Sequence, residues 1–272
     1  MLDIPYDVLE IIIDALASGL DDVYEPWRCL VDLKACALTN HALATLSRKH
    51  IFSTIHLVIP DAYGVEYNTL LHSQFIGLIS DSPDILGFIR KFSFRADAIG
   101  VDDVALIEAI LKLNKVRSLD VIFGYIRPPP YLQPVIDHLL QIPTLTHLLL
   151  RQTIGFSASS LLSCLNLSHL TLDDVIFSHE WGEDILLPLP KPIVLREFCS
   201  NAGREILPLI RARRPDGHHL IDFRALRCIG SLQSSPHLHF EAFERLIGVP
   251  RQLEEFYLQC TSKREPPTFT FT

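Results

Sequence analysis

Two histidines mark the place where imidazole chemistry could arise in this chain. His147 and His169 occupy the same position in successive copies of a short apolar pattern. If those copies form neighbouring strands, the two rings lie about 4.8 Å apart. Such a pair can hold a metal ion or respond to pH near neutrality. No third ligand is evident beside them, so we expect two solvent-facing imidazoles, and neither a metal site nor a cofactor.

A dense group of basic residues is the second chemical signal. It consists of Arg211, Arg213 and Arg214, followed by His218 and His219. Arginine clusters can bind acidic or phosphorylated segments of other proteins. Basic residues at the C-terminal end of a helix also complement its dipole and stay solvated. We favour the second interpretation for this cluster.

Two stretches resemble catalytic motifs and fail at a required position. Residues 155–159 (GFSAS) place Ser where the second glycine of a nucleophile elbow allows a tight turn. Residues 179–183 (HEWGE) place Glu where the helix of a zinc protease needs its second His ligand. We therefore expect no catalytic residues. The alternative, a hydrolase with Ser157 as its nucleophile, would be tested by a substrate screen.

Composition excludes several classes of protein. The chain has 24 basic and 32 acidic residues, and the resulting net charge of −8 has the wrong sign for wrapping nucleic acid. Its six cysteines form none of the closely spaced pairs of zinc or redox sites, so we expect reduced thiols. The N-terminus lacks a signal-peptide pattern and no apolar run reaches about 18 residues without charge. We expect no membrane span and a cytoplasmic or nuclear location.

A repeated pattern indicates the elements that position these side chains. The pattern is apolar-x-x-apolar-x-apolar, and most copies start 22 to 29 residues apart, a spacing typical of leucine-rich repeats. Five copies are clear and three are weaker. They begin at Phe52, Ile89, Val116, Leu145, Leu167, Leu195, Leu226 and Leu253.

The repeat predicts a parallel sheet with one buried side. The last two apolar residues of each copy are two apart, so on a strand they point the same way. Segments with helical spacing separate the copies, and a crossover through a helix makes successive strands parallel. These helical segments are 102–113, 131–142, 156–165, 204–213 and 240–249.

The chain thus resembles the leucine-rich-repeat family over residues 52–259. The resemblance implies a curved solenoid with strands on its inner face. The family's usual Asn, three residues after the third apolar position, is missing, so we expect irregular repeats. The register places a mixed set of side chains on the inner face as candidates for binding a target protein. They are Asp120, His147, Arg151, His169, Asp173, Glu197, Glu255 and Tyr257.

The first fifty residues differ from the repeat region in the spacing of their apolar residues. They predict two helices, over 4–16 and 30–48, and no strand copy. Ile11, Ile12 and Ile13 alone spread over about 200° of helix surface, wider than the stripe that one core needs. A segment this short cannot bury two apolar faces by itself. The excess must meet either the repeat region or a second protein.

These helices resemble an F-box over about residues 2–57. The resemblance is carried by residues 4–9 (IPYDVL), Ile12, Leu16, residues 33–43 (LKACALTNHAL) and residues 51–52. Ile4 and Asp7 stand where the family has Leu and Glu, and Leu43 replaces a common Trp. An insertion at 21–27 lengthens the loop between the helices.

The F-box resemblance implies a partner for each half of the chain. F-box proteins are substrate receptors of cullin-RING ubiquitin ligases, in which the F-box docks on a Skp-type adaptor and the following region holds the target. By matching position, we assign adaptor contact to Ile4, Pro5, Val8, Leu9, Ile12, Leu16, Leu33 and Leu38.

The expected fold class is therefore α/β, with an N-terminal helical F-box-like module followed by an irregular leucine-rich-repeat-like solenoid with a parallel sheet. The expected domains are 1–51 (helical module), 52–260 (repeat region) and 261–272 (C-terminal tail). The expected partners are the adaptor with its cullin complex and a protein target, without nucleic acid or membrane. The alternative is a stand-alone repeat scaffold whose first helices only cap the solenoid.

Overall fold

The computed structural model describes residues 4–18, 26–57, 64–178, 192–201, 209–211, 213, 217–233, 246, 249–250, 253–260 and 268–270. Of residues 26–27, 64–69, 231–233, 257–260 and 268–270 it describes the backbone alone. Outside the described residues lie most of the expected tail (261–267 and 271–272), the motif at 179–183, Arg214 and most of the helices expected over 204–213 and 240–249.

Three helices open the chain: α1 (Tyr6–Ala17), α2 (Pro26–Ala37) and α3 (His41–Ile51). The single helix expected over 30–48 is wrong, because the helix is interrupted between Ala37, the last residue of α2, and His41, the first residue of α3. Asn40 has extended dihedral angles there, and its side-chain oxygen accepts a hydrogen bond of 2.9 Å from the backbone N–H of Leu43. This is an N-cap, which starts a new helix.

The three helices share a small core of their own. Its buried members are Ile13, Ala17, Leu33 and Leu46. At its edge, the Nζ of Lys49 on α3 lies 2.7 Å from Glu10 Oε1 and 3.1 Å from Asp14 Oδ1 on α1. Among the described residues, this cluster is separate from the larger core that follows it.

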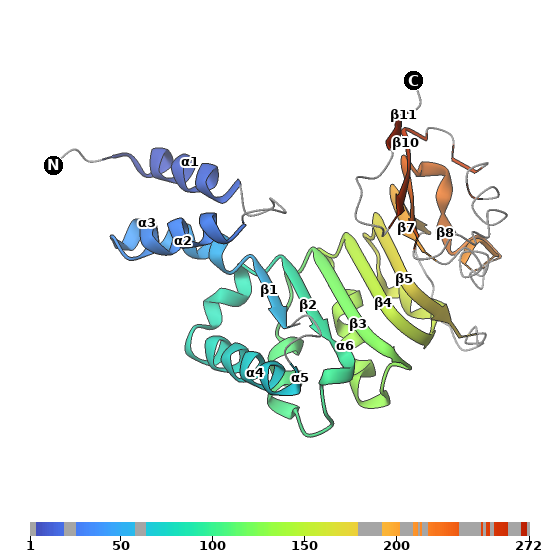
Figure 1. The fold of residues 1–272 in the computed structure, drawn as a ribbon, viewed down its shortest axis with the longest axis horizontal. Helices are drawn as coiled ribbons and strands as arrows, with labels where there is room; N and C mark the ends of the chain where they lie inside the picture. Colours follow the sequence, from blue (N-terminus) through green and yellow to red (C-terminus); the bar gives the residue numbers. More distant parts are fainter. Residues whose placement is uncertain are drawn as a thin grey trace.

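Each copy of the repeated pattern forms a strand, and the eight strands lie in chain order in one sheet (Figure 1). They are β1 (Thr54–Leu57), β2 (Lys91–Arg95), β3 (Ser118–Ile126), β4 (His147–Phe156), β5 (His169–Phe177), β7 (Glu197–Ser200), β9 (Cys228–Gln233) and β10 (Glu255–Cys260). Every neighbouring pair of these strands is parallel. The expectation of an α/β fold with a parallel sheet is confirmed.

Two smaller strand pairings complete the described sheets. β11 (Thr268–Thr270) adds to β10 in the antiparallel direction. β6 (Ile193–Val194) and β8 (Ile221–Asp222) form a separate parallel pair.

Helical segments connect the strands. Those described are α4 (Gly64–Asp81), α5 (Val104–Leu111), α6 (Gln133–Gln141) and the short 3-10 helices η3 (Pro83–Gly87), η4 (Ala96–Ala98), η5 (Pro130–Leu132), η6 (Ala158–Ser163) and η7 (Phe223–Ala225). The helices expected over 102–113 and 131–142 are confirmed as α5 and α6. The α-helix expected over 156–165 is wrong, because β4 continues to Phe156 and only the 3-10 helix η6 follows.

The larger core lies between the sheet and helices α4, α5 and α6, which cover one side of it (Figure 1). The second apolar position of each copy supplies one continuous row of that core. Its residues are Ile55, Phe92, Leu119, Leu148, Leu170, Phe198, Ile229 and Phe256.

A bend interrupts β3, β4 and β5, and the residues that follow it still contribute to this core. Tyr125, Gln152 and Asp174 have positive φ angles of 63°, 51° and 54°. Gly124 has φ of +64°, and a Cβ at that position would collide with the Asp97 carboxylate. Glycine is therefore required at position 124 for two reasons, the backbone conformation and the close approach of Asp97.

Candidate functional site

The side of the sheet that faces away from the helices carries polar side chains in register. One row crosses the strands from Lys91 through Ser118, His147 and His169 to Glu197. It continues to Cys228 and Glu255. Parallel pairing thus brings residues that are more than 100 positions apart in the chain onto one line.

The two histidines of this row stack on each other. Their ring centroids are 3.9 Å apart and the planes differ by 9°. The Nδ1 atoms lie 2.8 Å from the hydroxyls of Thr146 and Ser168 respectively. Nε2 of His169 lies 3.6 Å from Glu197 Oε2. Burial and the neighbouring imidazole lower the pKa of His147 below its ordinary value.

Within the described part of the chain, no group of three or more His, Cys, Asp or Glu side chains is placed to hold an ion. The thiol of Cys228, which follows Glu197 in the row, has its pKa raised to about 12, chiefly by burial and then by nearby acidic groups. It is therefore protonated at neutral pH.

A second group of polar residues surrounds Arg151. Its Nη2 atom lies 3.4 Å from Asp120 Oδ2 on the preceding strand. Asp173 stands opposite Arg151 on the following strand. Burial raises the pKa values of both carboxyl groups, while the guanidinium acts in the opposite direction. The three side chains form a compact charged cluster on the exposed side of β3, β4 and β5.

Asn201, directly after β7, supports this cluster. Its Nδ2 donates to Asp173 Oδ1 at 2.6 Å and to Asp174 Oδ1 at 2.8 Å, and its Oδ1 accepts from the Asp174 backbone N–H at 2.8 Å. Tyr125 also donates its hydroxyl to Asp174 at 2.9 Å. The side chain of Asn201 thus satisfies the backbone N–H at the bend of β5. Asn201 is one residue after the third position of its repeat copy, whereas the family's usual Asn is three residues after it.

The structure brings together six of the eight residues expected to bind a target. Asp120, His147, Arg151, His169 and Asp173 lie on β3, β4 and β5, and Glu197 adjoins them on β7. Glu255 is exposed on β10, two strands further on. The side chain of Tyr257 lies outside the described part.

A second candidate surface lies on the opening helices, where α1 keeps an apolar face toward solvent. Ile4, Val8, Ile11 and Ile12 are 53, 40, 68 and 45 % exposed. Ile4 precedes the helix, whose N-cap is Pro5. Within α1, Val8, Ile11, Ile12 and the exposed Ala15 fall within a stripe about 100° wide, at about 100° per residue. The buried residues of α1 occupy roughly the opposite face. We call Ile4, Val8, Ile11, Ile12 and Ala15 the α1 stripe.

α2 also leaves apolar side chains uncovered. Val31 is 56 % exposed and Leu38, directly after the helix, is 88 % exposed. With the exposed Ala35 they are spaced at three and four residues, so they share one side of α2.

The residues expected to contact an adaptor divide into exposed and buried groups. Ile4, Pro5, Val8, Ile12 and Leu38 are exposed. Leu33 is fully buried in the small core, so its assignment as a contact is corrected: its side chain holds the three helices together. Leu9 and Leu16 are half-buried against the same core.

The adaptor contacts expected from the sequence left out Ile11 and Val31, which belong to the exposed surfaces of α1 and α2. Sequence reasoning also missed four arginines, Arg90, Arg117, Arg196 and Arg227, which directly follow the first apolar residue of four repeat copies. Their common position in the pattern was the signal that could have found them.

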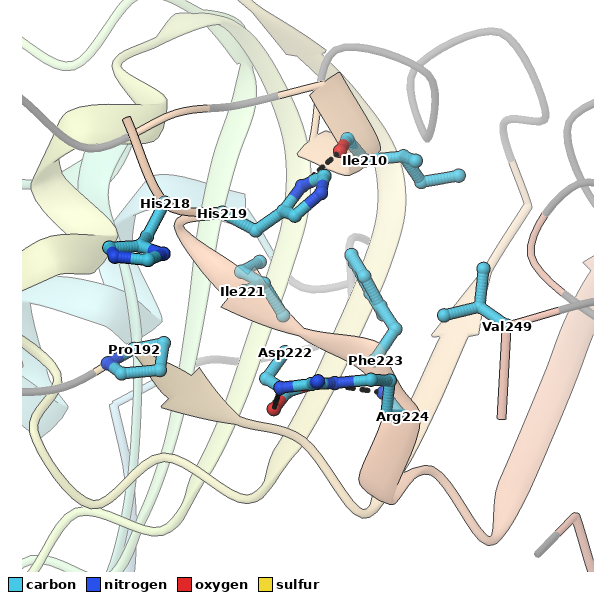
Figure 2. A pocket seen from close by; sticks show the side chains of 9 residues that line it. All are labelled: Pro192, Ile210, His218, His219, Ile221, Asp222, Phe223, Arg224 and Val249. Carbon is cyan, nitrogen blue, oxygen red and sulfur yellow. Dashed lines mark hydrogen bonds and ion pairs between the residues drawn. The ribbon is translucent and has the colours of Figure 1, made fainter. Parts of the chain in front are cut away.

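A hollow of about 570 Å³ lies near β8 (Figure 2). Apolar side chains line much of it, among them Pro192, Ile221 and Phe223. Arg224 turns back on Asp222, with Nε 2.9 Å from Oδ1 and Nη2 2.8 Å from Oδ2. The guanidinium is thus paired within the chain, which leaves little charge to orient a polar ligand.

The basic cluster of the sequence adjoins this hollow. His218 and His219 line it, and His219 Nδ1 lies 3.1 Å from the Ile210 carbonyl oxygen. Arg211 and Arg213 are exposed. These exposed positions are consistent with the solvated basic cluster expected from the sequence.

No protein-family model matches the chain, and the curated proteins contain no significant match. In the described ranges, no helix is both long enough and apolar enough to cross a membrane.

Proposed function

We propose that this chain is the substrate-recognition subunit of a cullin-RING ubiquitin ligase. In this proposal α1, α2 and α3 form an F-box that docks on a Skp-type adaptor. The sheet that follows is an irregular leucine-rich-repeat-like solenoid, whose polar exposed side binds a target protein.

The uncovered α1 stripe is the observation that carries the proposal. An isolated exposed isoleucine needs no explanation, but a contiguous apolar stripe on a helix that already buries its opposite face is typical of an interaction site. Docking of such a helix into a groove buries a few apolar anchors, and these dominate the binding energy. The exposed residues Ile4, Val8 and Ile12 are also among those that match the F-box pattern.

The sheet supports the second half of the proposal. Eight strands in chain order, each built from one copy of the same pattern, are what a leucine-rich-repeat-like region requires. The charged cluster around Arg151 and the stacked histidines supply hydrogen-bonding groups of both signs for a protein target.

The alternative is a repeat scaffold whose first helices only cap the sheet. A cap would turn its apolar side chains toward the strands it covers. In the described residues the three helices close around their own core, and the α1 stripe faces solvent. This observation favours adaptor docking over capping.

Co-purification with a Skp-type adaptor tests the proposal. We expect wild-type protein to retain the adaptor and the double variant Val8→Asp/Ile12→Asp to lose at least nine-tenths of it while keeping its helical circular dichroism. Val101→Asp is the matched control, because Val101 is 62 % exposed and lies away from these helices. Adaptor binding by the double variant, or none by wild type, would contradict the proposal.

A further inference from the structure

A ladder of backbone hydrogen bonds lines up the residues that stand just before the strands. The carbonyl of Arg117 accepts the N–H groups of Thr146 and His147, each at 2.9 Å. The carbonyl of Ser168 accepts those of Arg196 and Glu197 in the same way, at 2.8 and 3.1 Å. The ladder joins eight positions in all: Ser53, Arg90, Arg117, Thr146, Ser168, Arg196, Arg227 and Glu254.

Four of these eight positions are arginines, and two of them have partners for their guanidinium groups. Arg90 donates from Nη1 to the carbonyl oxygens of Gly87 and Ile89, at 2.8 and 3.2 Å. Nη1 of Arg227 lies 3.5 Å from Glu254 Oε1. Arg117 and Arg196 are exposed, and neither has a side-chain hydrogen bond or ion pair in the part of the chain that the structure describes.

Arg117 and Arg196 line the same hollow, which has a volume of about 790 Å³. Two strands, β4 and β5, separate the strands that follow them, so their Cα atoms lie about 14 Å apart at the usual strand spacing. Between them the hollow is lined by the hydroxyl residues Thr144, Thr146 and Ser168 and by Asn166. We call this hollow the ladder groove.

Apolar side chains border the ladder groove. Leu165 is 61 % exposed and Val194 is 45 % exposed, and Pro143 and Pro192 also line it. A free inorganic anion would use only the arginines, because the hydroxyls of Thr144, Thr146 and Ser168 already form hydrogen bonds within the chain. A peptide segment would use both the charged and the apolar parts of the surface.

We propose that the ladder groove binds an extended segment of a partner protein that carries a phosphorylated serine or threonine. A phosphoryl group brings up to two negative charges and three acceptor oxygens, which guanidinium groups contact through paired N–H donors. Residues beside the phosphorylated one pack on Leu165 and Val194. The net charge of −8 opposes nucleic acid and anionic membranes, which need many cations over a wide area.

This inference goes beyond the proposed ligase function and does not depend on it. The ladder groove lies at the edge where the strands begin, and its binding is measured with the chain alone, without the adaptor. Failure of either proposal therefore leaves the other standing.

The test uses the full chain and a degenerate peptide library with a fixed central phosphoserine or phosphothreonine. We expect binding to the phosphorylated library at least about tenfold above that to its unphosphorylated copy, because only the phosphorylated peptides form charge-assisted hydrogen bonds with the two guanidinium groups. The double variant Arg117→Ala/Arg196→Ala should lose this preference. Arg227→Ala is the matched control, since Arg227 shares the ladder position but is paired with Glu254.

Several outcomes would overturn the inference. One is equal binding of the two libraries, and another is an undiminished preference in the double variant. A third is binding of a glutamate-substituted library as tight as that of the phosphorylated one. A fourth is binding of single-stranded RNA or phosphatidylserine vesicles, but not of phosphopeptides, that depends on the same two arginines. Circular dichroism of each variant confirms that the sheet is intact.

Discussion

Asp120 and Asp173 flank Arg151 on the exposed side of the sheet, yet burial raises the pKa of both. The guanidinium therefore does not fully compensate for the loss of water around the two carboxylates. Such a cluster stores unfavourable electrostatic energy that an incoming target with a suitable cation could relieve. The residue types could be read from the repeat register, whereas their burial depends on the packing of neighbouring strands in the folded chain.

Because burial outweighs the effect of Arg151 on the pKa of Asp120, the substitution Asp120→Asn should change the stability of the protein with pH. A carboxyl group whose pKa is raised on folding binds its proton more tightly in the folded state, so its contribution to stability falls as the pH rises above the unfolded value of 3.8. At pH 7 the ionised group is destabilising. We expect Asp120→Asn to raise the free energy of unfolding in urea at pH 7, with a difference that narrows toward pH 4.

The exposed Asp102 provides the control, because Asp102→Asn should change the urea midpoint little at either pH. A less stable Asp120→Asn protein at pH 7 would mean that the ion pair with Arg151 outweighs the burial of the carboxylate.

The strands could be predicted from sequence because their apolar residues alternate with the period of a strand and because buried rows need Leu, Ile, Val or Phe at two positions in every copy. The break between α2 and α3 was missed, although Asn40 is a good N-cap residue, because the apolar pattern continues across it. The wrong assignment of Leu33, beside the exposed Leu38, has a different cause. Both are leucines on one predicted helix, and only the packing of three helices decides that one is buried and the other exposed.

Gly124, at the bend in β3, and Gly77, inside α4, should respond in opposite ways to substitution by alanine. Gly124→Ala should lower the free energy of unfolding by about 1–2 kcal/mol, because an L-residue at positive φ is strained and its Cβ meets Asp97. Gly77→Ala, inside α4 with open space around its Cβ, should raise it by about 0.5–1 kcal/mol. Urea denaturation of both variants measures the effects, and shifts of the same sign would refute this interpretation of the bend.

Across the whole molecule, the described structure has two separate apolar cores and several distinct surfaces. The helical N-terminal part leaves the α1 stripe uncovered, and the sheet presents polar rows that include the Arg151 cluster. The ladder groove lies at the edge where the strands begin. It could not be predicted from the sequence, because residues up to 79 positions apart are lined up only by the register of the parallel strands. Together these surfaces support a protein that joins two partners.

Amide hydrogen exchange of the full chain, with and without a Skp-type adaptor, tests the proposed docking most directly. We expect the adaptor to slow exchange in residues 6–17 and 28–38, while the amides of β3, β4 and β5 exchange at unchanged rates. Unchanged exchange in α1 and α2 at saturating adaptor, or protection confined to the strands, would contradict docking through the opening helices.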